Sequence, residues 1–143
     1  MSTTKLYTPR MLGLSADLAH YPLCDELTHC AEARSRTCGS TIEIGFALDA
    51  SGAVADIGMQ VSACAVGQSS AAILARHVAG KLPVEIDATR TAIMAWLEGE
   101  APLPDWPEFD ALAPARDHPG RHGALLLPWN AASEALSSPA SNG

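Results

Sequence analysis

The chain has 143 residues, of which 48% are apolar and only 17% are charged, with a formal net charge of -7. This length suits a single domain over residues 1–143, and the apolar content is enough to form a hydrophobic core. The nine lysine and arginine residues are scattered along the sequence, whereas a nucleic-acid-binding protein needs clustered cations against the phosphate backbone. We therefore expect no nucleic-acid partner.

We expect no secretory signal at the beginning of the sequence. No continuous apolar stretch follows residues 1–5, as a secretory signal would require, and no run reaches the roughly 18 apolar residues of a membrane span. We therefore expect a cytoplasmic protein without membrane contact. Because thiols stay reduced in that compartment, we expect its four cysteines to be ligands, nucleophiles or packing residues rather than disulfides.

The first predicted element is a helix that begins at Thr8 and Pro9, because a hydroxyl cap followed by proline is typical of a helix start. Apolar residues follow at helical spacing, and the pattern ends near residue 21. Residues 23–37 are polar and irregular, and within them residues 31–36 are a candidate for a short edge strand.

The clearest pattern in the chain predicts a β-hairpin. Apolar residues alternate with polar or small ones over residues 42–48 and again over residues 57–61. Between these runs, the segment Asp-Ala-Ser-Gly at residues 49–52 marks a turn.

The register of this hairpin follows from the requirement that both apolar sets face the same side. That requirement places Phe46 opposite Ile57 and leaves residues 51–52 as the tight turn. Continued along the strands, the same register sets Gly39 opposite Cys64. Cys38 and Cys64 are therefore predicted to arrive at the same end of the hairpin.

Two helices are predicted after Cys64. The first carries an apolar stripe from Val66 to Val78 and stops at Gly80. The second runs from about Val84 to Glu98 and is expected to turn four apolar residues inward: Ile86, Ile93, Met94 and Leu97.

The C-terminal part is predicted to hold an irregular connection and a last helix. Residues 100–120 contain five prolines, and Trp106 and Phe109 are expected to attach this connection to the core. The last helix carries Leu125, Trp129, Ala132 and Leu136, and a frayed tail follows over residues 137–143. Together these elements predict an α+β fold in which a small antiparallel sheet of about three strands packs against helices.

Two cysteines have positions suited to chemistry. Cys64 lies where a strand passes into a helix, and the free N–H groups and positive dipole end of a helix N-terminus favour a thiolate. Cys38 precedes the first hairpin strand, beside Gly39. Two thiols on one rim suit a soft metal or sulfur chemistry. The alternative, that both are small packing residues, stays open on spacing alone.

The segments around these cysteines resemble a known family. Residues 33–40, Ala-Arg-Ser-Arg-Thr-Cys-Gly-Ser, and residues 62–71, which lead from Cys64 into a small-residue helix, are similar to the two cysteine boxes of the NifU/IscU/SufU iron–sulfur cluster assembly scaffolds. Residues 126–129, Leu-Leu-Pro-Trp, resemble the helix after the third cysteine of SufU-type members. The resemblance spans about residues 7–136 and implies an IscU/SufU-like fold.

The resemblance also implies a function. Members of this family assemble or hand on iron–sulfur clusters, receive sulfur from a cysteine desulfurase and serve apo iron–sulfur client proteins; SufU-type members carry zinc and accept persulfide sulfur. It therefore implies a scaffold or sulfur acceptor, not an enzyme in the ordinary sense, which binds a transient iron–sulfur cluster or zinc through Cys38 and Cys64.

The sequence departs from the family pattern at two ligand positions. The family site uses three cysteines and an aspartate, with a histidine beside the third cysteine in IscU. Here Ser40 occupies the aspartate position and Ala124 the position of the third cysteine. His122 lies close to the place of the family histidine, so the resemblance implies a metal site of Cys38, Cys64 and His122.

Three further residues lie in the irregular stretch before Cys38. Cys24, His29 and Cys30 are interpreted as loop residues without a metal role, although they remain candidates to complete the site.

Two rival functions remain open. The missing aspartate and cysteine favour a degenerate family member that binds no cluster and acts as a non-catalytic interaction module. A zinc-binding sulfurtransferase or thiol redox enzyme that uses the Cys38/Cys64 pair is the weaker alternative, because the sequence has no Cys-x-x-Cys motif.

Overall fold

The computed structural model describes residues 8–36 and 39–137 of the chain. Cys38 and most of the tail predicted for residues 137–143 lie outside this part. Within it, helices and strands follow in the order α1 (Pro9–Ala16), η1 (Asp17–His20), β1 (His29–Arg34), β2 (Thr41–Leu48), β3 (Val54–Ser62), α2 (Ala65–His77), α3 (Pro83–Leu97), η2 (Phe109–Asp117), η3 (Pro119–Arg121) and α4 (His122–Ser137), where η marks a 3₁₀ helix.

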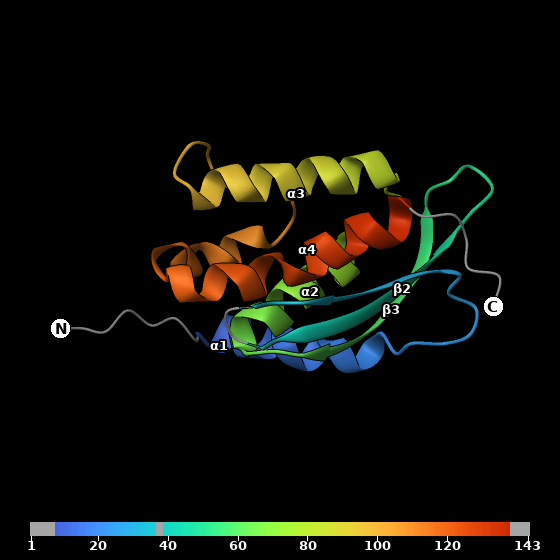
Figure 1. Cartoon of the computed structure of the whole chain (residues 1–143), viewed down its shortest axis with the longest axis horizontal. Coiled ribbons are helices and arrows are strands. Elements are labelled where there is room, and N and C mark those ends of the chain that lie inside the picture. Colours follow the sequence, from blue (N-terminus) through green and yellow to red (C-terminus); the bar gives the residue numbers. More distant parts are fainter. Residues whose placement is uncertain (1–7, 37–38, 138–143) are drawn as a thin grey trace.

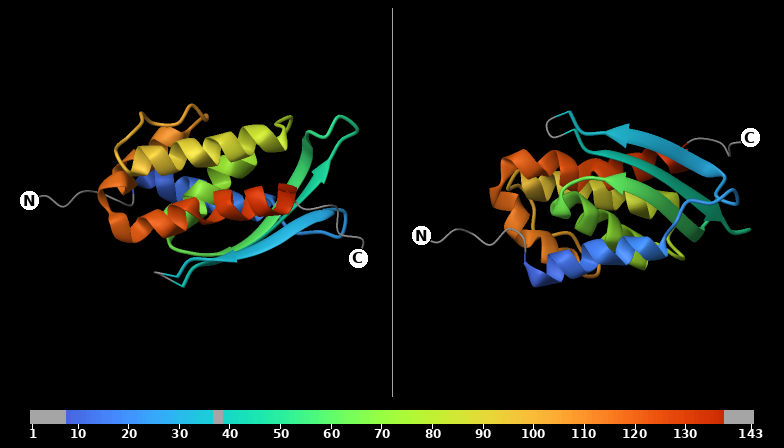
Figure 2. Two further views of the ribbon diagram at one scale, coloured as in Figure 1. Left: turned by 45° about the horizontal axis from the view of Figure 1, so that its top comes forward. Right: turned by 90° about the horizontal axis from the view of Figure 1, so that it is seen from below.

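The strands form one antiparallel sheet in the order β1-β2-β3, and α2 and α4 cover its inner face. α3 lies on the far side of α4 as a further layer, and α1 lies alongside α2 (Figure 1). The outer face of the twisted sheet is turned away from α2, α3 and α4 (Figure 2). The predicted α+β fold, a small antiparallel sheet packed against helices, is confirmed.

α2 runs through the middle of the core. The predicted stripe from Val66 to Val78 is buried, and so are most of the small residues between its members. α1, α4, η2 and the sheet surround this helix, and small side chains let these neighbours approach closely. The helix ends before Gly80, which has a φ of 85° as a C-terminal glycine commonly does.

α3 spans Pro83–Leu97, within a residue of the predicted bounds at each end, but one predicted inward residue is wrong. Met94 is 41% exposed, whereas Ile86, Ile93 and Trp96 are buried. The buried stripe passes through Trp96 because this ring packs edge-on against Phe109, with ring centroids 5.6 Å apart.

The proline-rich connection is attached to the core by its aromatic residues, as predicted. Trp106 and Phe109 are buried, and the indole N–H of Trp106 donates a hydrogen bond to the carbonyl oxygen of Ile73, 3.0 Å away. Trp106 also packs edge-on against Trp129 of α4, with centroids 5.0 Å apart. The connection is more regular than predicted, because it contains η2 and η3.

The β2–β3 register is as predicted, with Phe46 opposite Ile57, but the predicted tight turn at residues 51–52 is wrong. A β-bulge lets Leu48 pair with Val54, so residues 49–53 form a longer loop. The Asp49 carboxylate organises this loop by accepting hydrogen bonds from the backbone N–H groups of residues 51 and 53.

Residues 21–28, here called the strap, cross part of the outer face of the sheet. A Cβ at Gly58 would clash with the carbonyl oxygen of Pro22, and one at Gly45 would lie 2.9 Å from the Cβ of Leu27. Only glycine lets the strap come this close. The strap leads into β1, which is the predicted edge strand shifted toward the N-terminus.

In the part of the chain that the structure describes, no helix combines the length and the apolar character needed to cross a membrane.

Candidate functional site

The candidate site lies at one end of the sheet, here called the cysteine end, where β1 finishes at Arg34, β2 begins at Thr41 and β3 finishes at Ser62. These three residues pair across the sheet. Gly39 and Cys64 each lie two residues beyond the last pair, so both belong to this end, as the register predicted.

The connection between β1 and β2 is closed by backbone hydrogen bonds. The N–H of Ser35 donates a hydrogen bond to the carbonyl oxygen of Ser40 at 2.8 Å, and the N–H of Gly39 donates one to the carbonyl oxygen of Ser35 at 3.2 Å. Gly39 has a φ of 71°, a left-handed conformation that favours glycine. Cys38 precedes Gly39 but lies outside the described residues, so its predicted approach to Cys64 stays a prediction.

Cys64 lies at the predicted transition from strand to helix. It is the N-cap of α2, with extended backbone (φ -68°, ψ 172°), and it is half-buried. Its thiol makes no capping hydrogen bond within the described residues. The N–H groups of the first turn of α2 therefore point toward the space around this thiol without a side-chain cap, which favours negative charge there.

The start of α4 lies against the first turn of α2. A Cβ at Gly67 would lie 3.3 Å from the carbonyl oxygen of Ala124 and 3.4 Å from its Cβ. Ala124, which the sequence resemblance aligned with the third cysteine, is fully buried at this contact. Ala124 thus contacts α2 about one helical turn after Cys64, and its methyl group cannot bind a metal.

His122 is the first residue of α4, and its ring is hydrogen-bonded to the preceding segment. Its Nε2 lies 2.7 Å from the carbonyl oxygen of Arg116, so Nε2 carries the proton and Nδ1 is the nitrogen with a lone pair. A metal-binding histidine commonly holds its second nitrogen in this way. Side chains two residues apart on a helix point about 200° apart, so His122 points away from the face on which Ala124 meets α2.

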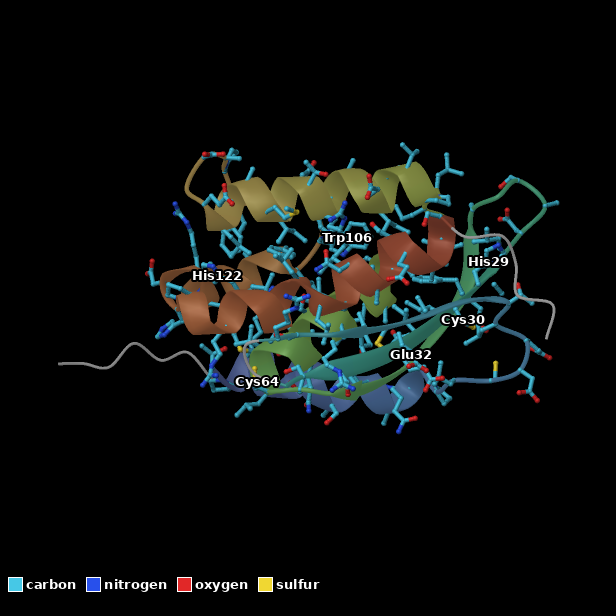
Figure 3. All side chains as sticks on the ribbon, viewed as in Figure 1. His29, Cys30, Glu32, Cys64, Trp106 and His122 are labelled. Carbon is cyan, nitrogen blue, oxygen red and sulfur yellow. The ribbon has the colours of Figure 1, made fainter. Side chains whose placement is uncertain are left out.

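His29 and Cys30 are strand residues of β1, not loop residues as predicted. Cys30 pairs with Gly45, and its thiol donates a hydrogen bond to the carbonyl oxygen of Leu27 at 3.1 Å. At about 3.4 Å per residue, Cys30 is roughly 14 Å from the end of β1–β2 pairing at Thr41. Figure 3 shows His29 and Cys30 at the opposite end of the long axis from Cys64 and His122.

The described residues at the cysteine end offer fewer metal ligands than the four of a structural metal site. Across residues 8–36 and 39–137, no three cysteine, histidine, aspartate or glutamate residues are grouped to hold a metal ion. Ser40 is buried and Ala124 has no donor atom. The described residues at this end therefore do not supply the four ligands of a structural metal site.

The sequence interpretation did not single out the two glutamates and the glutamine on the outer face of the sheet near this site. Glu32, Glu43 and Gln60 are exposed there and line a groove next to the cysteine end. The alternation that identified the hairpin also marks these positions, because every second residue must face away from the core.

Comparison with solved structures gives close matches in fold. The crystal structure of the N-terminal part of a nitrogen-fixing NifU-like protein from Brucella abortus superimposes with a TM-score of 0.84 over 93% of each chain, at 29% sequence identity. A candidate iron–sulfur cluster assembly scaffold for the SUF system of the thermophile Fervidobacterium islandicum AW-1 gives a TM-score of 0.77 over 94% of this chain and 99% of its own, at 19% identity.

A third solved structure, of a hypothetical protein, gives a TM-score of 0.68 at 22% identity, over 90% of this chain and 98% of its own. By sequence, no family model matches the chain, and no curated protein gives a significant match.

Proposed function

We propose that this chain, whose fold is that of NifU/SufU-like scaffolds, serves iron–sulfur cluster assembly as a scaffold or sulfur acceptor. The observation that carries the proposal is the likeness to the NifU-like protein of Brucella abortus, which extends over nearly the whole of both chains. The position of Cys64 at the N-cap of α2, at the same end of the sheet as Gly39, supports it.

In this proposal, Cys38 and Cys64 are the thiolate ligands of a cluster that the protein holds only in transit. Cys64 is suited to this role because it is half-buried and lies at the positive end of α2. The protein would accept sulfur from a cysteine desulfurase and hand the cluster to apo iron–sulfur clients, with zinc as the alternative ion. Such a protein carries cargo and is not an enzyme.

His122 is the proposed third ligand, through Nδ1. In the structure Nε2 donates a hydrogen bond to the carbonyl oxygen of Arg116, and the ring gives up this bond when it turns toward the cysteines. Because the ring starts from the side of α4 that faces away from α2, this ligation needs a rotation of the side chain. Positions 40 and 124 contribute neither a carboxylate nor a thiolate, which leaves coordination positions open.

The test is anaerobic reconstitution with iron and sulfide, followed by metal analysis and an absorption spectrum. We expect the wild-type protein to bind iron and sulfide with thiolate-to-iron absorption, and the Cys38→Ala and Cys64→Ala variants to lose both. Cys24→Ala is the control, because Cys24 is a free thiol that lies in the strap.

The main rival is a non-catalytic interaction module that binds no cluster. The absence of a ligand atom on Ala124 and the neutral hydroxyl of Ser40 favour it. A wild-type protein that retains no iron, sulfide or zinc after reconstitution would establish this rival and exclude the scaffold. Metal retained equally by Cys24→Ala, Cys38→Ala and Cys64→Ala would exclude the proposed ligands.

A further inference from the structure

The outer face of the sheet carries a groove of about 490 Å³ beside the cysteine end. The strap covers the same face farther along, over Gly45 and Gly58, and leaves this part open. The volume of the groove falls in the range of sites that bind small molecules. Each strand contributes two outward-facing side chains to the groove, which is lined by Glu32, Arg34, Thr41, Glu43, Gln60 and Ser62.

The groove carries three charged side chains, those of Glu32, Arg34 and Glu43. Glu32 and Glu43 are directly opposite each other in the β1–β2 pairing, an arrangement of like charges that destabilises a sheet. Arg34 lies one step farther along the same face. In the described part of the chain, no ion pair or hydrogen bond involves the side chains of these three residues. Two carboxylates and a guanidinium therefore stand side by side with their binding capacity unused.

We propose that this groove binds the α-amino-acid head group of a small thiol, either cysteine or a γ-glutamyl thiol peptide such as glutathione. The ammonium group lies between Glu32 and Glu43, and the carboxylate accepts hydrogen bonds from Arg34. The row that holds both glutamates and the row that holds Arg34 are about 7 Å apart, two residues along the strand. A head group with both charges on one carbon bridges this gap with charge-assisted hydrogen bonds of about 2.8 Å on either side.

The thiol part of the inference rests on the proposed function. Gln60 and Ser62 line the groove, and Cys64 follows two residues beyond Ser62, where β3 has ended and the chain passes into α2, which is at most about 7 Å of chain. The cargo site there lacks the family's third thiolate, because position 124 is alanine. A thiol whose head group is held in the groove extends toward the cysteine end and supplies the missing thiolate from outside the chain.

The groove itself is tested on metal-free protein by isothermal titration calorimetry. S-methylglutathione has the head group but no thiol, so we expect it to bind, whereas N-acetylcysteine, which lacks the ammonium group, should not. The Glu32→Gln, Glu43→Gln and Arg34→Gln variants should each bind about tenfold more weakly, because each loses a charge-assisted hydrogen bond. Glu98→Gln, an exposed charge at the end of α3, is the control and should bind as the wild type does.

No binding of S-methylglutathione to the wild-type protein, or binding to all three groove variants as tight as to the wild type, would overturn the inference. The thiol part is tested on protein loaded with Zn²⁺. We expect glutathione to bind more tightly to the loaded than to the metal-free protein, while S-methylglutathione binds equally to both. Equal binding of glutathione to both forms would show that its thiol does not serve as a metal ligand. A protein that takes up no metal would refute the scaffold function. The titration of the metal-free protein with S-methylglutathione would still show whether the groove binds the head group.

Discussion

At the scale of single residues, Gly67 sets the distance between the two helices that build the cysteine end. An added Cβ would lie 2.8 Å from the Cβ of Ala63 and 3.3 Å from the backbone of Ala124. The backbone neighbour cannot move without shifting α4 relative to α2. The missing side chain is therefore a packing requirement of the site and not a flexible point in the helix.

The Gly67→Ala variant should lower the free energy of unfolding by about 1–3 kcal/mol, the usual cost of overpacking a core. Urea unfolding measures it. Gly13→Ala is the matched control, since Gly13 lies on the exposed side of α1 with no atom within 4 Å of an added Cβ. That control should raise stability by about 0.5–1 kcal/mol. Equal effects of the two substitutions would contradict the close approach of α2 and α4.

His122 can be tested as a ligand separately from its structural hydrogen bond. His122→Gln keeps an N–H donor for the carbonyl oxygen of Arg116 but loses the imidazole, whereas His122→Ala loses both. If His122 is the third ligand, both variants should weaken Zn²⁺ binding by at least about tenfold, measured by competition with a chromophoric chelator. Only His122→Ala should also lose about 1 kcal/mol of stability. Unchanged Zn²⁺ affinity in His122→Gln would show that His122 is not a ligand and only holds η2 in place through its hydrogen bond to Arg116.

At the scale of elements, α2 and η2 are joined by a small charged cluster. One carboxylate oxygen of Glu108 lies 2.7 Å from both His77 Nε2 and Arg76 Nε. Glu108 starts η2 with a φ of 67°, a strained backbone for a residue with a side chain. The hydrogen bond from His77, together with the charge of Arg76, holds the pKa of the Glu108 carboxyl below its ordinary value.

A carboxyl whose pKa is lowered by folding stabilises the protein above the pKa of the unfolded state, about 4.3. This contribution is lost as the pH falls through the lower folded-state pKa. Glu108→Gln should therefore reduce stability by about 0.5–1 kcal/mol at pH 7 and flatten the acid limb of the stability curve below about pH 4.3. Urea unfolding between pH 3 and 7 measures both effects. An acid limb as steep as that of the wild type would show that the cluster does not couple folding to protonation.

The β-hairpin and the helices could be predicted because their periodicity reflects one buried face. The alternation of residues 42–48 and 57–61 was enough to fix the register. The longer β2–β3 loop was not predictable from that alternation, because the Asp49 side chain stabilises it through local hydrogen bonds. Met94 was misplaced for a related reason: helical spacing alone does not show that Trp96 has an aromatic partner in η2.

The candidate site was predictable only in part. The sequence was sufficient to place Cys64 at a strand-to-helix transition at the same end of the hairpin as Gly39. The path of the strap was not, because its only sequence signal is two glycines, Gly45 and Gly58, on neighbouring strands. The hydrogen bond from His122 to Arg116 depends on how η2 and η3 approach α4, which no local pattern encodes.

At the scale of the whole molecule, the core extends far beyond the candidate site, although the partly buried Cys64 packs against it. The large, fully buried residues come from the sheet, α1, α2, α3, η2 and α4, and they form one continuous cluster. A core of this kind folds without binding energy from a metal, in contrast to small domains whose folding free energy is metal-binding energy.

Chelation should therefore remove the bound metal without unfolding the protein. Because two thiolates and one imidazole leave open coordination positions, EDTA should remove bound metal readily, while thermal unfolding stays cooperative. The Cys38→Ala and Cys64→Ala variants should behave like the chelated wild type. Circular dichroism during heating, with metal analysis of the same samples, checks this. Unfolding on chelation would make the site structural and favour the interaction module.

Transfer of a cluster to an apo client is the measurement that tests the scaffold function most directly. Wild-type protein is reconstituted anaerobically, freed of unbound iron and sulfide, and mixed with an apo-ferredoxin, whose cluster is followed by circular dichroism in the visible range. We expect the ferredoxin to gain its cluster from the wild-type and Cys24→Ala proteins but not from Cys64→Ala. A ferredoxin that stays apo with the reconstituted wild type, or that gains its cluster equally well with Cys64→Ala, would contradict the scaffold function.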